Sequence, residues 1–285
     1  MKPKRHRAKK RLGQNFLYDP AIARKILDAT GLGPGDTVVE LGPGRGILTR
    51  ELVARGVRLV ALEVDDELVQ QLREEFVGIA ASGADSLTRA EILNEDFSKI
   101  SLSGLLAARN LDRCTLVGNI PYYLTRDVLF SYLVDENEVI DAAYIMLQKE
   151  VGDRIVSPPG SRVYGITSVV LQSVYDVRVV TKVAPGSFAP RPRVASVVLE
   201  FKPLLQPLLN PQELGPFVTL VKNLFQQRRK TISNTLKAFY SLQEPELTGI
   251  ESDTGIDLGM RPEELSKEQF LSISRSLTGD ANGRS

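Results

Sequence analysis

Apolar and polar positions alternate with two different periods along the first half of the chain. Short apolar runs at residues 37–41, 58–62 and 114–118 have the length and β-branched content of buried strands. Between the second and third runs, residues 67–76 repeat their apolar positions at helical spacing, with Leu68, Leu72 and Phe76 on one face. Strands that alternate with helices over residues 37–148 predict a parallel sheet covered on both faces.

The pattern changes after residue 168. Residues 168–183 and 196–201 are rich in β-branched residues, and they flank a loop with several prolines at 185–192. This arrangement predicts an antiparallel end to the same sheet. Pro203, Pro207 and Pro211 then interrupt the pattern, and helical periodicity returns at 213–240 and 262–277. We therefore predict a basic flexible tail at 1–12, an α/β domain at 13–203 and a small all-helical domain at 204–285.

Composition limits the chemistry that the chain can perform. Of its 285 residues 42% are hydrophobic, which is enough for one large core and a smaller one. The single cysteine, Cys114, lies within an apolar strand and reads as a buried hydrophobic residue. The single histidine, His6, lies in the basic tail, so a His-dependent triad or zinc site is disfavoured. No apolar run is long enough to span a membrane and no signal peptide is recognisable, so we expect a cytoplasmic protein. We also expect that it binds no metal and that it acts as a monomer.

Positive charge is unevenly distributed although the net charge is only +1. Seven of the first eleven residues are Lys or Arg, a composition that attracts polyanions. A transit peptide is disfavoured because the motif that contains Gln14 and Asn15 follows this tail almost at once, which leaves little sequence that could be removed. Arg228, Arg229 and Lys230 form a second cluster, which is either a solvated helix face or, with Arg191, Arg193 and the tail, a track for nucleic-acid phosphates.

The segment after the first predicted strand is a glycine loop. Gly42, Gly44 and Gly46 follow residues 37–41 and precede a helical pattern, and glycines let a ligand approach the backbone closely. The spacing is G-x-G-x-G, which departs from the dinucleotide-binding pattern G-x-G-x-x-G. Glu63 ends the second strand about twenty positions on, where an acid can bind two ribose hydroxyls. Asp96 follows a third apolar pair, and taken by itself this position favours a solvated turn residue or helix cap over a ligand contact.

The third strand ends in Asn119-Ile120-Pro121-Tyr122. Proline fixes its own backbone and favours an extended Ile120, so the Ile120 carbonyl is presented outward, while Asn119 adds a second acceptor and Tyr122 a stacking face. Two acceptors that take the hydrogens of a ring amine favour a more nucleophilic nitrogen. The tetrapeptide therefore indicates amino-methyl transfer, and the alternative is a strand that stops at a proline turn with a surface tyrosine.

Taken together, these motifs resemble one family, the rRNA adenine N6,N6-dimethyltransferases, in particular its bacterial small-subunit branch. The motifs occur in the family's order over about residues 11 to 277. They are Gly-Gln-Asn-Phe-Leu at 13–17, Glu-Leu-Gly-Pro-Gly-Arg-Gly-Ile-Leu-Thr at 40–49, Glu-Val-Asp at 63–65, Asn-Ile-Pro-Tyr at 119–122, Gln-Lys-Glu-Val at 148–151, Phe-Ala-Pro-Arg-Pro-Arg-Val at 188–194 and Gln-Arg-Arg-Lys-Thr at 227–231.

The resemblance implies a Rossmann-like class I methyltransferase sheet with a helical C-terminal domain. It implies S-adenosylmethionine as the methyl donor and adenosines of small-subunit rRNA, within an immature ribosomal particle, as the substrate. It implies donor contacts from Asn15, Leu17, Gly42, Gly44, Glu63, Asp96 and Asn119. The target base would be held by Asn119, Ile120, Pro121 and Tyr122, with Phe188 on its opposite face unless Phe188 is simply a core residue.

Three other functions stay open at this point. A large-subunit rRNA adenine methyltransferase of the antibiotic-resistance type would share the pocket, and residues 228–231 favour the small-subunit enzyme. A non-catalytic ribosome-assembly or transcription factor on the same fold is disfavoured because no pocket residue is lost. An NAD-dependent dehydrogenase is disfavoured by the glycine spacing and by the lack of a histidine placed for acid–base chemistry.

Overall fold

The computed structural model describes residues 14–81 and 90–282, and the basic tail predicted at 1–12 lies outside them. The chain forms two compact units. The sheet unit comprises the residues up to Gly152 together with Arg178–Pro203, and the helical unit comprises Asp153–Val177 together with the residues from Leu204 onward.

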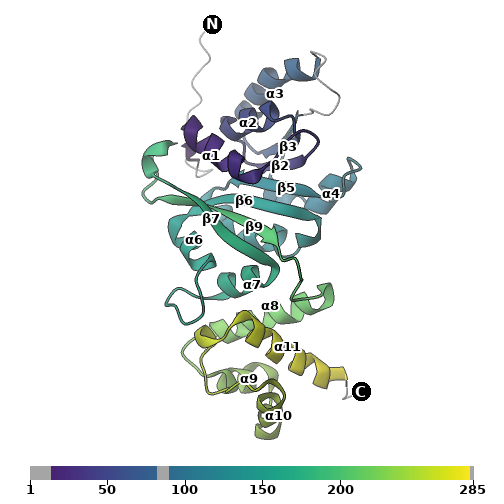
Figure 1. Cartoon of the computed structure of the whole chain (residues 1–285), viewed down its shortest axis with the longest axis vertical. Helices are drawn as coiled ribbons and strands as arrows, with labels where there is room; N and C mark the ends of the chain where they lie inside the picture. The colour runs from purple at the N-terminus through teal and green to yellow at the C-terminus, as the bar shows by residue number, and fades with distance from the viewer. Residues whose placement is uncertain (1–13, 82–89, 283–285) are drawn as a thin grey trace. The chain divides into compact units, whose positions relative to one another are not determined.

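A seven-stranded sheet has the order β4-β3-β2-β5-β6-β9-β7 (Figure 1). Strands β4, β3, β2, β5 and β6 pair in parallel, and β9 pairs antiparallel with β6. The predicted parallel sheet with an antiparallel end is therefore confirmed. The strands are β2 Thr37–Leu41, β3 Arg58–Glu63, β4 Ala90–Asn94, β5 Cys114–Asn119, β6 Ile140–Gln148, β7 Tyr175–Val183 and β9 Ser196–Pro203.

The central strands form the core because their side chains are buried on both faces, as expected for a parallel sheet. Cys114 is one of these buried residues. Helices and short helical turns follow the strands, and two short strands, β1 and β8, pair in a separate antiparallel sheet. These elements are β1 Phe16–Leu17, α1 Pro20–Thr30, α2 Ile47–Ala54, α3 Asp66–Ala81, η2 Phe97–Lys99, α4 Leu102–Ala107, η3 Tyr122–Leu124, α5 Thr125–Asp127, η4 Val128–Tyr132, η5 Asn137–Val139, α6 Lys149–Ile155, η6 Pro185–Ser187 and β8 Phe188–Ala189.

The helical unit confirms the predicted helical C-terminal region. Its helices α8 to α11 form one group (Figure 1), and α8 contacts both α9 and α11. A ring stack between Phe225 and Phe270, with centroids 5.8 Å apart, belongs to the core of this unit. Its elements are α7 Ile166–Val174, α8 Pro211–Gln226, α9 Ile232–Tyr240, α10 Glu244–Thr254, η7 Pro262–Glu264 and α11 Lys267–Asn282.

One strand prediction is wrong, because residues 168–174 are helical. Ser168 Oγ accepts a hydrogen bond from Gly165 N at 3.1 Å, which caps the start of α7. Val169, Val170 and Leu171 are all fully buried, so the segment shows no one-sided helical pattern and resembles a buried strand in sequence. Because α7 contacts α8 and α11, Asp153–Val177 belongs to the helical unit. The predicted domain boundary had placed this segment in the α/β domain.

The single helix predicted at 213–240 is two helices, α8 and α9. Residues 227–230 form a turn between them, and Thr231 Oγ1 caps α9 by accepting from Asn234 N at 3.4 Å. The helix predicted at 262–277 is likewise divided into η7 and α11, and α10 was not predicted. Throughout the described residues, no helix has both the length and the apolar character needed to cross a bilayer.

Candidate functional site

The carboxyl ends of β4, β3, β2 and β5 meet at one edge of the sheet and open into one cavity of about 140 Å³. The chain runs from β2 outward through β3 and β4 and then returns to β5 on the other side of β2. Ligands of open α/β sheets bind at such a reversal of strand order. The lining residues are Gln14, Asn15, Phe16, Leu17, Glu40, Gly42, Pro43, Gly44, Arg45, Ile47, Leu48, Leu62, Glu63, Val64, Asp96, Phe97, Asn119, Ile120, Pro121, Tyr122, Tyr123, Leu124 and Phe188.

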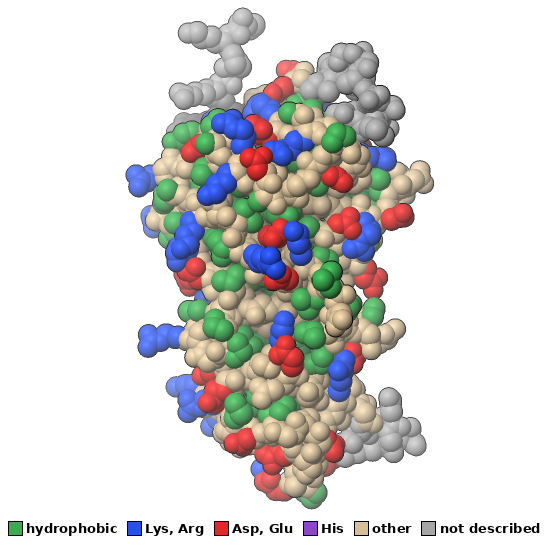
Figure 2. Space-filling view, in the orientation of Figure 1, with side chains coloured by type: hydrophobic (Ala, Val, Ile, Leu, Met, Phe, Trp, Pro, Cys, Tyr) green, Lys and Arg blue, Asp and Glu red, His purple; other side chains and the backbone are tan. Residues whose placement is uncertain are grey.

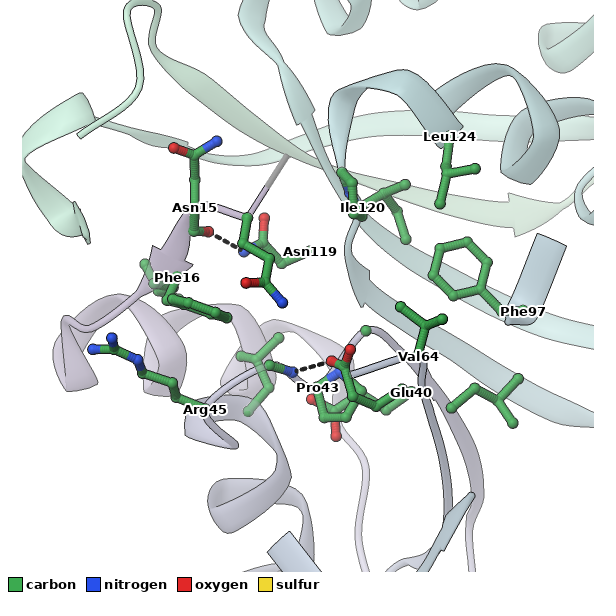
Figure 3. Close-up of a pocket in the computed structure, with 18 of the residues that line it drawn as sticks. Asn15, Phe16, Glu40, Pro43, Arg45, Val64, Phe97, Asn119, Ile120 and Leu124 are labelled. Carbon is green, nitrogen blue, oxygen red and sulfur yellow. Dashed lines mark hydrogen bonds between the residues drawn. The ribbon is translucent and has the colours of Figure 1, made fainter. Parts of the chain in front are cut away.

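The predicted glycine loop forms the floor of this cavity between β2 and α2 (Figure 3). Gly44 has a φ of +58°, and a Cβ there would lie 2.9 Å from Phe16 Cδ1, so only glycine fits. A Cβ at Gly42 would meet no atom nearer than Phe97 Cε1 at 3.9 Å. The backbone at Gly42 therefore faces open space in which a ligand can lie against the main chain.

Glu63 ends β3 inside the cavity and is only 5% exposed. Its two carboxylate oxygens accept hydrogen bonds from Gly44 N and Asp65 N, each at 3.0 Å. These bonds tie the carboxylate to the glycine loop and leave further lone pairs for a ligand. Burial raises the pKa of Glu63 above the usual carboxyl value, which favours a partner that donates hydrogen bonds or carries positive charge.

Glu40 is a second buried carboxyl in the same cavity, and it was not predicted as a site residue. It is the penultimate residue of β2, is 1% exposed, and accepts a hydrogen bond from Thr49 Oγ1 at 2.8 Å. Burial raises its pKa to about 8, and the charge of Glu63 adds to the effect. Among the described residues, neither acid has a cation within ion-pair distance. The cavity is therefore suited to a positively charged ligand.

The stability of the free protein should fall as the pH rises because of Glu40. Its carboxyl binds a proton more tightly in the folded state, with a pKa of about 8, than in the unfolded state, where the value is 4.5. Stability is therefore greatest below about pH 4.5 for this group and declines until the folded carboxyl is ionised, by on the order of a few kcal/mol. Glu40→Gln should remove this decline, which urea unfolding at about pH 5 and about pH 9 can measure.

Glu136→Gln is a control of opposite sign. Burial alone would raise the pKa of Glu136, but hydrogen bonds from Ser103, Leu102 and Ser101 at the start of α4 outweigh burial and lower the pKa. Its contribution is present above the unfolded carboxyl pKa and is lost as the pH falls. Glu136→Gln should therefore destabilise at neutral pH. The same pH trend in both variants would contradict the role given to Glu40.

Asp96 lies where the sequence placed it, after β4 and at the cavity. Its Oδ1 accepts hydrogen bonds from Ser98 Oγ at 2.7 Å and Ser98 N at 3.1 Å, and these bonds lower its pKa. Asp96 is thus also the cap of η2, the alternative that the sequence left open. Beside it, Val64 is 45% exposed and Phe97 is buried, and both line the cavity. These two apolar residues were not predicted, although each directly follows a predicted acid.

Asn119 ends β5 and faces the glycine loop across the cavity (Figure 3). Its Nδ2 donates a hydrogen bond to the carbonyl oxygen of Asn15 at 3.1 Å. A carbonyl oxygen can only accept, so the NH₂ side of the amide is held there and Oδ1 is the other arm of the amide. Asn119 therefore keeps an acceptor for a ligand, as the tetrapeptide predicted.

The rest of the tetrapeptide turns at the cavity rim. Pro121 has φ −54° and ψ 133°, an extended conformation, and Tyr122 begins η3. Tyr122 OH lies 3.4 Å from Ser196 Oγ, while Phe188 on β8 is 4% exposed. Phe188 belongs to the hydrophobic core and also lines the cavity.

The predicted nucleic-acid contacts are not among the residues that line the cavity. Arg191 and Arg193 are exposed on the sheet unit, after β8. In the helical unit, Arg228 donates to Arg162 O at 2.8 Å and lies 3.5 Å from Glu263, so it links the segment before α7 to η7. Arg229 and Lys230 are exposed on the turn, not on a helix face. On the face drawn in Figure 2, Lys and Arg are interspersed with Asp and Glu.

No group of His, Cys, Asp and Glu within residues 14–81 and 90–282 is arranged to hold a metal ion. The predicted donor and base residues, from six separate segments of the chain, all line one cavity: Asn15, Leu17, Gly42, Gly44, Glu63, Asp96, Asn119, Ile120, Pro121, Tyr122 and Phe188.

Comparison with known proteins agrees with the motifs. Residues 5–279 match a family model described as "Ribosomal RNA adenine dimethylase". A protein of Geobacter metallireducens named "Ribosomal RNA small subunit methyltransferase A" is 41% identical over 272 residues, covering 95% of this chain and 96% of the relative. A protein of the same name from Moorella thermoacetica is 38% identical, covering 94% and 92%.

Two solved structures share the fold over nearly the whole chain. The 23S rRNA methyltransferase ErmE has a TM-score of 0.68 at 25% identity and covers 93% of this chain and 100% of its own. A dimethyladenosine transferase from Plasmodium falciparum has a TM-score of 0.73 at 21% identity, covering 90% of this chain and 95% of its own.

Proposed function

Because this chain belongs to the ribosomal RNA adenine dimethylase family, we propose that it methylates N6 of two adjacent adenosines in small-subunit rRNA. The resemblance of the sequence motifs to this family is thereby confirmed. The adenosines lie in a hairpin loop near the 3' end, and the product is N6,N6-dimethyladenosine. The enzyme acts as a monomer in the cytoplasm, on a small-subunit particle that is still maturing.

The arrangement of Asn119 opposite two buried carboxyls carries this proposal. One side of the cavity offers acceptors and aromatic faces for a flat amine-bearing base, and the other offers two buried carboxyl groups and apolar surface. Methyl transfer from a cationic donor to a ring amine needs both a site for the base and a site for the donor. The assembly factor without catalysis is disfavoured because every predicted pocket residue lines the cavity.

The cavity fits S-adenosylmethionine, which when bound supplies a methyl group activated by a sulfonium. Glu40 and Glu63 are buried without a cation partner among the described residues, as a cationic ligand requires. Glu63 would hold the ribose hydroxyls, Asp96 the adenine amino group, and Val64 and Phe97 the adenine ring. Gly42 and Gly44 would lie against the methionine end, with Asn15 and Leu17 above them.

The target adenine must leave its stack to reach this cavity, which costs least in a loop. Tyr122 stacks on one face of the base and Phe188 covers the other. Asn119 Oδ1 and the Ile120 carbonyl would accept the two amine hydrogens, which would make the nitrogen lone pair more available for methylation. No general base is needed, because the amine proton becomes acidic only after transfer. A second transfer follows when the methylated amine keeps one of the two hydrogen bonds.

The choice of rRNA rests on the similarity to small-subunit enzymes. The relatives with this name are 41% and 38% identical. The similar 23S rRNA methyltransferase is 25% identical, so a large-subunit substrate is the second candidate. Incubation with labelled S-adenosylmethionine and separately purified small or large ribosomal particles, followed by nucleoside analysis, distinguishes the two. Label only in large particles, or none in either, would contradict the proposal.

RNA binding should depend on Arg229 and Lys230 more than on Arg228, which is held by protein contacts. Replacing both Arg229 and Lys230 by Gln should weaken binding to a small-subunit RNA fragment. It should also lower the slope of log K against log salt by roughly 1 to 2, since two phosphate contacts are lost. Filter binding over a range of salt concentrations measures the slope.

A matched control removes two positive charges that carboxylates already neutralise. Lys237 pairs with Glu244, and Arg275 pairs with Glu213, both within the helical unit. Replacing Lys237 and Arg275 by Gln should leave the slope unchanged. An equal reduction in both pairs of variants would show that only overall charge matters, and it would remove Arg229 and Lys230 from the RNA contact.

A further inference from the structure

Residues 14–17 form a short segment, here called the strap, that crosses the cavity and is fastened at separate points (Figure 3). The strap pairs with β8, where Leu17 lies opposite Phe188. Gln14 Nε2 donates to Asp65 Oδ2 at 3.1 Å. The guanidinium of Arg45 lies over the ring of Phe16, 4.7 Å from its centroid.

The contacts of the strap extend to the side of the cavity where the methyl donor is proposed to bind. Asp65 N donates to Glu63, and Gly44 leaves room for the Phe16 ring. A strap that lifted would therefore uncover the glycine loop and lose contacts beside Glu63. The strap is part of the cavity wall against which the proposed donor would lie.

The strap also reaches the base side through one hydrogen bond. Asn15 O accepts from Asn119 Nδ2 at 3.1 Å, across 104 residues of sequence. An amide can rotate about its last bond and exchange its oxygen and nitrogen at little cost. The Asn15 carbonyl removes this freedom, because only the NH₂ group can face it. The oxygen of Asn119 is therefore aimed by the main chain of the strap.

We propose that the strap is the positioning element of this enzyme, coupling the donor wall to the direction of the Asn119 oxygen. This inference rests on the proposed function, since it assigns Asn119 Oδ1 to the amine. When the strap is seated, the acceptor points to the substrate nitrogen. When the strap is displaced, the amide turns freely and the acceptor is lost even if the base is bound.

The coupling explains why an amide is required at position 119. A carboxylate offers two acceptors and would suit a ring amine equally well or better. Here, however, one of its oxygens would face the Asn15 carbonyl oxygen, and two acceptors at hydrogen-bond distance repel. A protonated carboxyl can donate to Asn15 O and still present its other oxygen. Asn119→Asp should therefore work only in its protonated form.

The variant Asn119→Asp tests this requirement through its pH profile. Relative to the wild type, its kcat should rise at least about tenfold between about pH 8.5 and about pH 5.5, as the introduced carboxyl gains a proton. Nearby carboxyls should make this protonation easier, because like charges disfavour ionisation. The titratable and charged residues that line the same cavity are Glu40, Glu63, Asp96, Arg45, Tyr122 and Tyr123. Asn119→Ala, which cannot donate, should show no such recovery.

Hydrogen exchange of the strap gives a readout that needs neither donor nor RNA. At about pH 8.5, the amides of residues 15–18 should exchange at least about tenfold faster in Asn119→Asp than in Asn119→Ala, after correction for intrinsic rates. At about pH 5.5 this difference should disappear. Equal protection in the two variants at both pH values would overturn the proposal.

A double-mutant cycle tests the coupling without changing charge at the site. Gln14→Ala loosens the strap at Asp65, and it should lower kcat at saturating donor in the wild type. In the Asn119→Ala background the same change should have no further effect on kcat, since no acceptor remains to be aimed. Independent, additive losses would show that the strap acts on the donor alone.

Failure of the proposed function would look different. If the wild type methylated no adenosine of either rRNA, the kcat measurements would give no values. Hydrogen exchange of the strap in the free protein would still test the positioning role. If the wild type is active and the pH profile of Asn119→Asp runs parallel to its own, the positioning role is refuted and the function stands.

Discussion

Asn119→Ala should lower kcat by about a hundredfold or more, while the Kd for S-adenosylmethionine should change only a few-fold. The expected loss is that of one group aimed at the reacting centre in an enclosed site, about 2.7–4 kcal/mol. Asn119 lies at the end of β5, and its amide oxygen is the arm not bound to Asn15. Single-turnover methylation at saturating donor measures kcat, and calorimetry with the free enzyme measures the donor Kd.

Asn94→Ala is the matched control for this variant. Asn94 also ends a strand, β4, and its Nδ2 also donates to a main-chain carbonyl, that of Glu63 at 3.2 Å. It does not line the cavity. Its replacement should leave kcat within about twofold of the wild type. Equal losses of kcat and donor affinity in Asn119→Ala would show that Asn119 is a donor contact and not the amine acceptor.

Glu63→Ala should weaken donor binding by roughly ten- to a hundredfold. Hydrogen bonds to a charged group contribute about 1.5–3 kcal/mol, and about 1.4 kcal/mol corresponds to a factor of ten. The carboxylate also holds Gly44 N and Asp65 N, so its removal loosens the loop beneath the donor. Calorimetric titration with S-adenosylmethionine measures the change in Kd.

Two comparisons separate this effect from general charge loss and from unfolding. Glu95→Ala removes the same charge from an exposed position after β4, outside the cavity, and should leave the Kd unchanged. Because burial raises the pKa of Glu63, its removal should not destabilise the fold through lost charge, and thermal unfolding of the variant checks this. Unchanged donor affinity in Glu63→Ala would exclude Glu63 from the ribose site.

The strands of the parallel sheet could be predicted from the sequence because strands that are buried on both faces consist of continuous apolar runs. Residues 37–41 and 58–62 became β2 and β3 almost residue for residue. Where burial was equally complete in a helix, the same signal misled: residues 168–174 are α7, capped at Gly165 and packed against other helices. The local pattern of apolar residues indicates that a segment is buried, but it does not indicate whether the segment is buried as a strand in a sheet or as a helix among other helices.

The sequence by itself predicted side chains that the structure brings together in one cavity, since the glycine loop, the acids and the tetrapeptide each lie at the end of a strand that the sequence pattern identifies. It also determined the family, through the order of those motifs. Only the tertiary structure decided how the groups act. It buried Glu40 without a cation among the described residues, bound Arg228 to its neighbours, and turned the Asn119 amide against Asn15. Each of these depends on contacts between residues far apart in the chain, where the direction of a hydrogen bond and the loss of water have no local sequence signal.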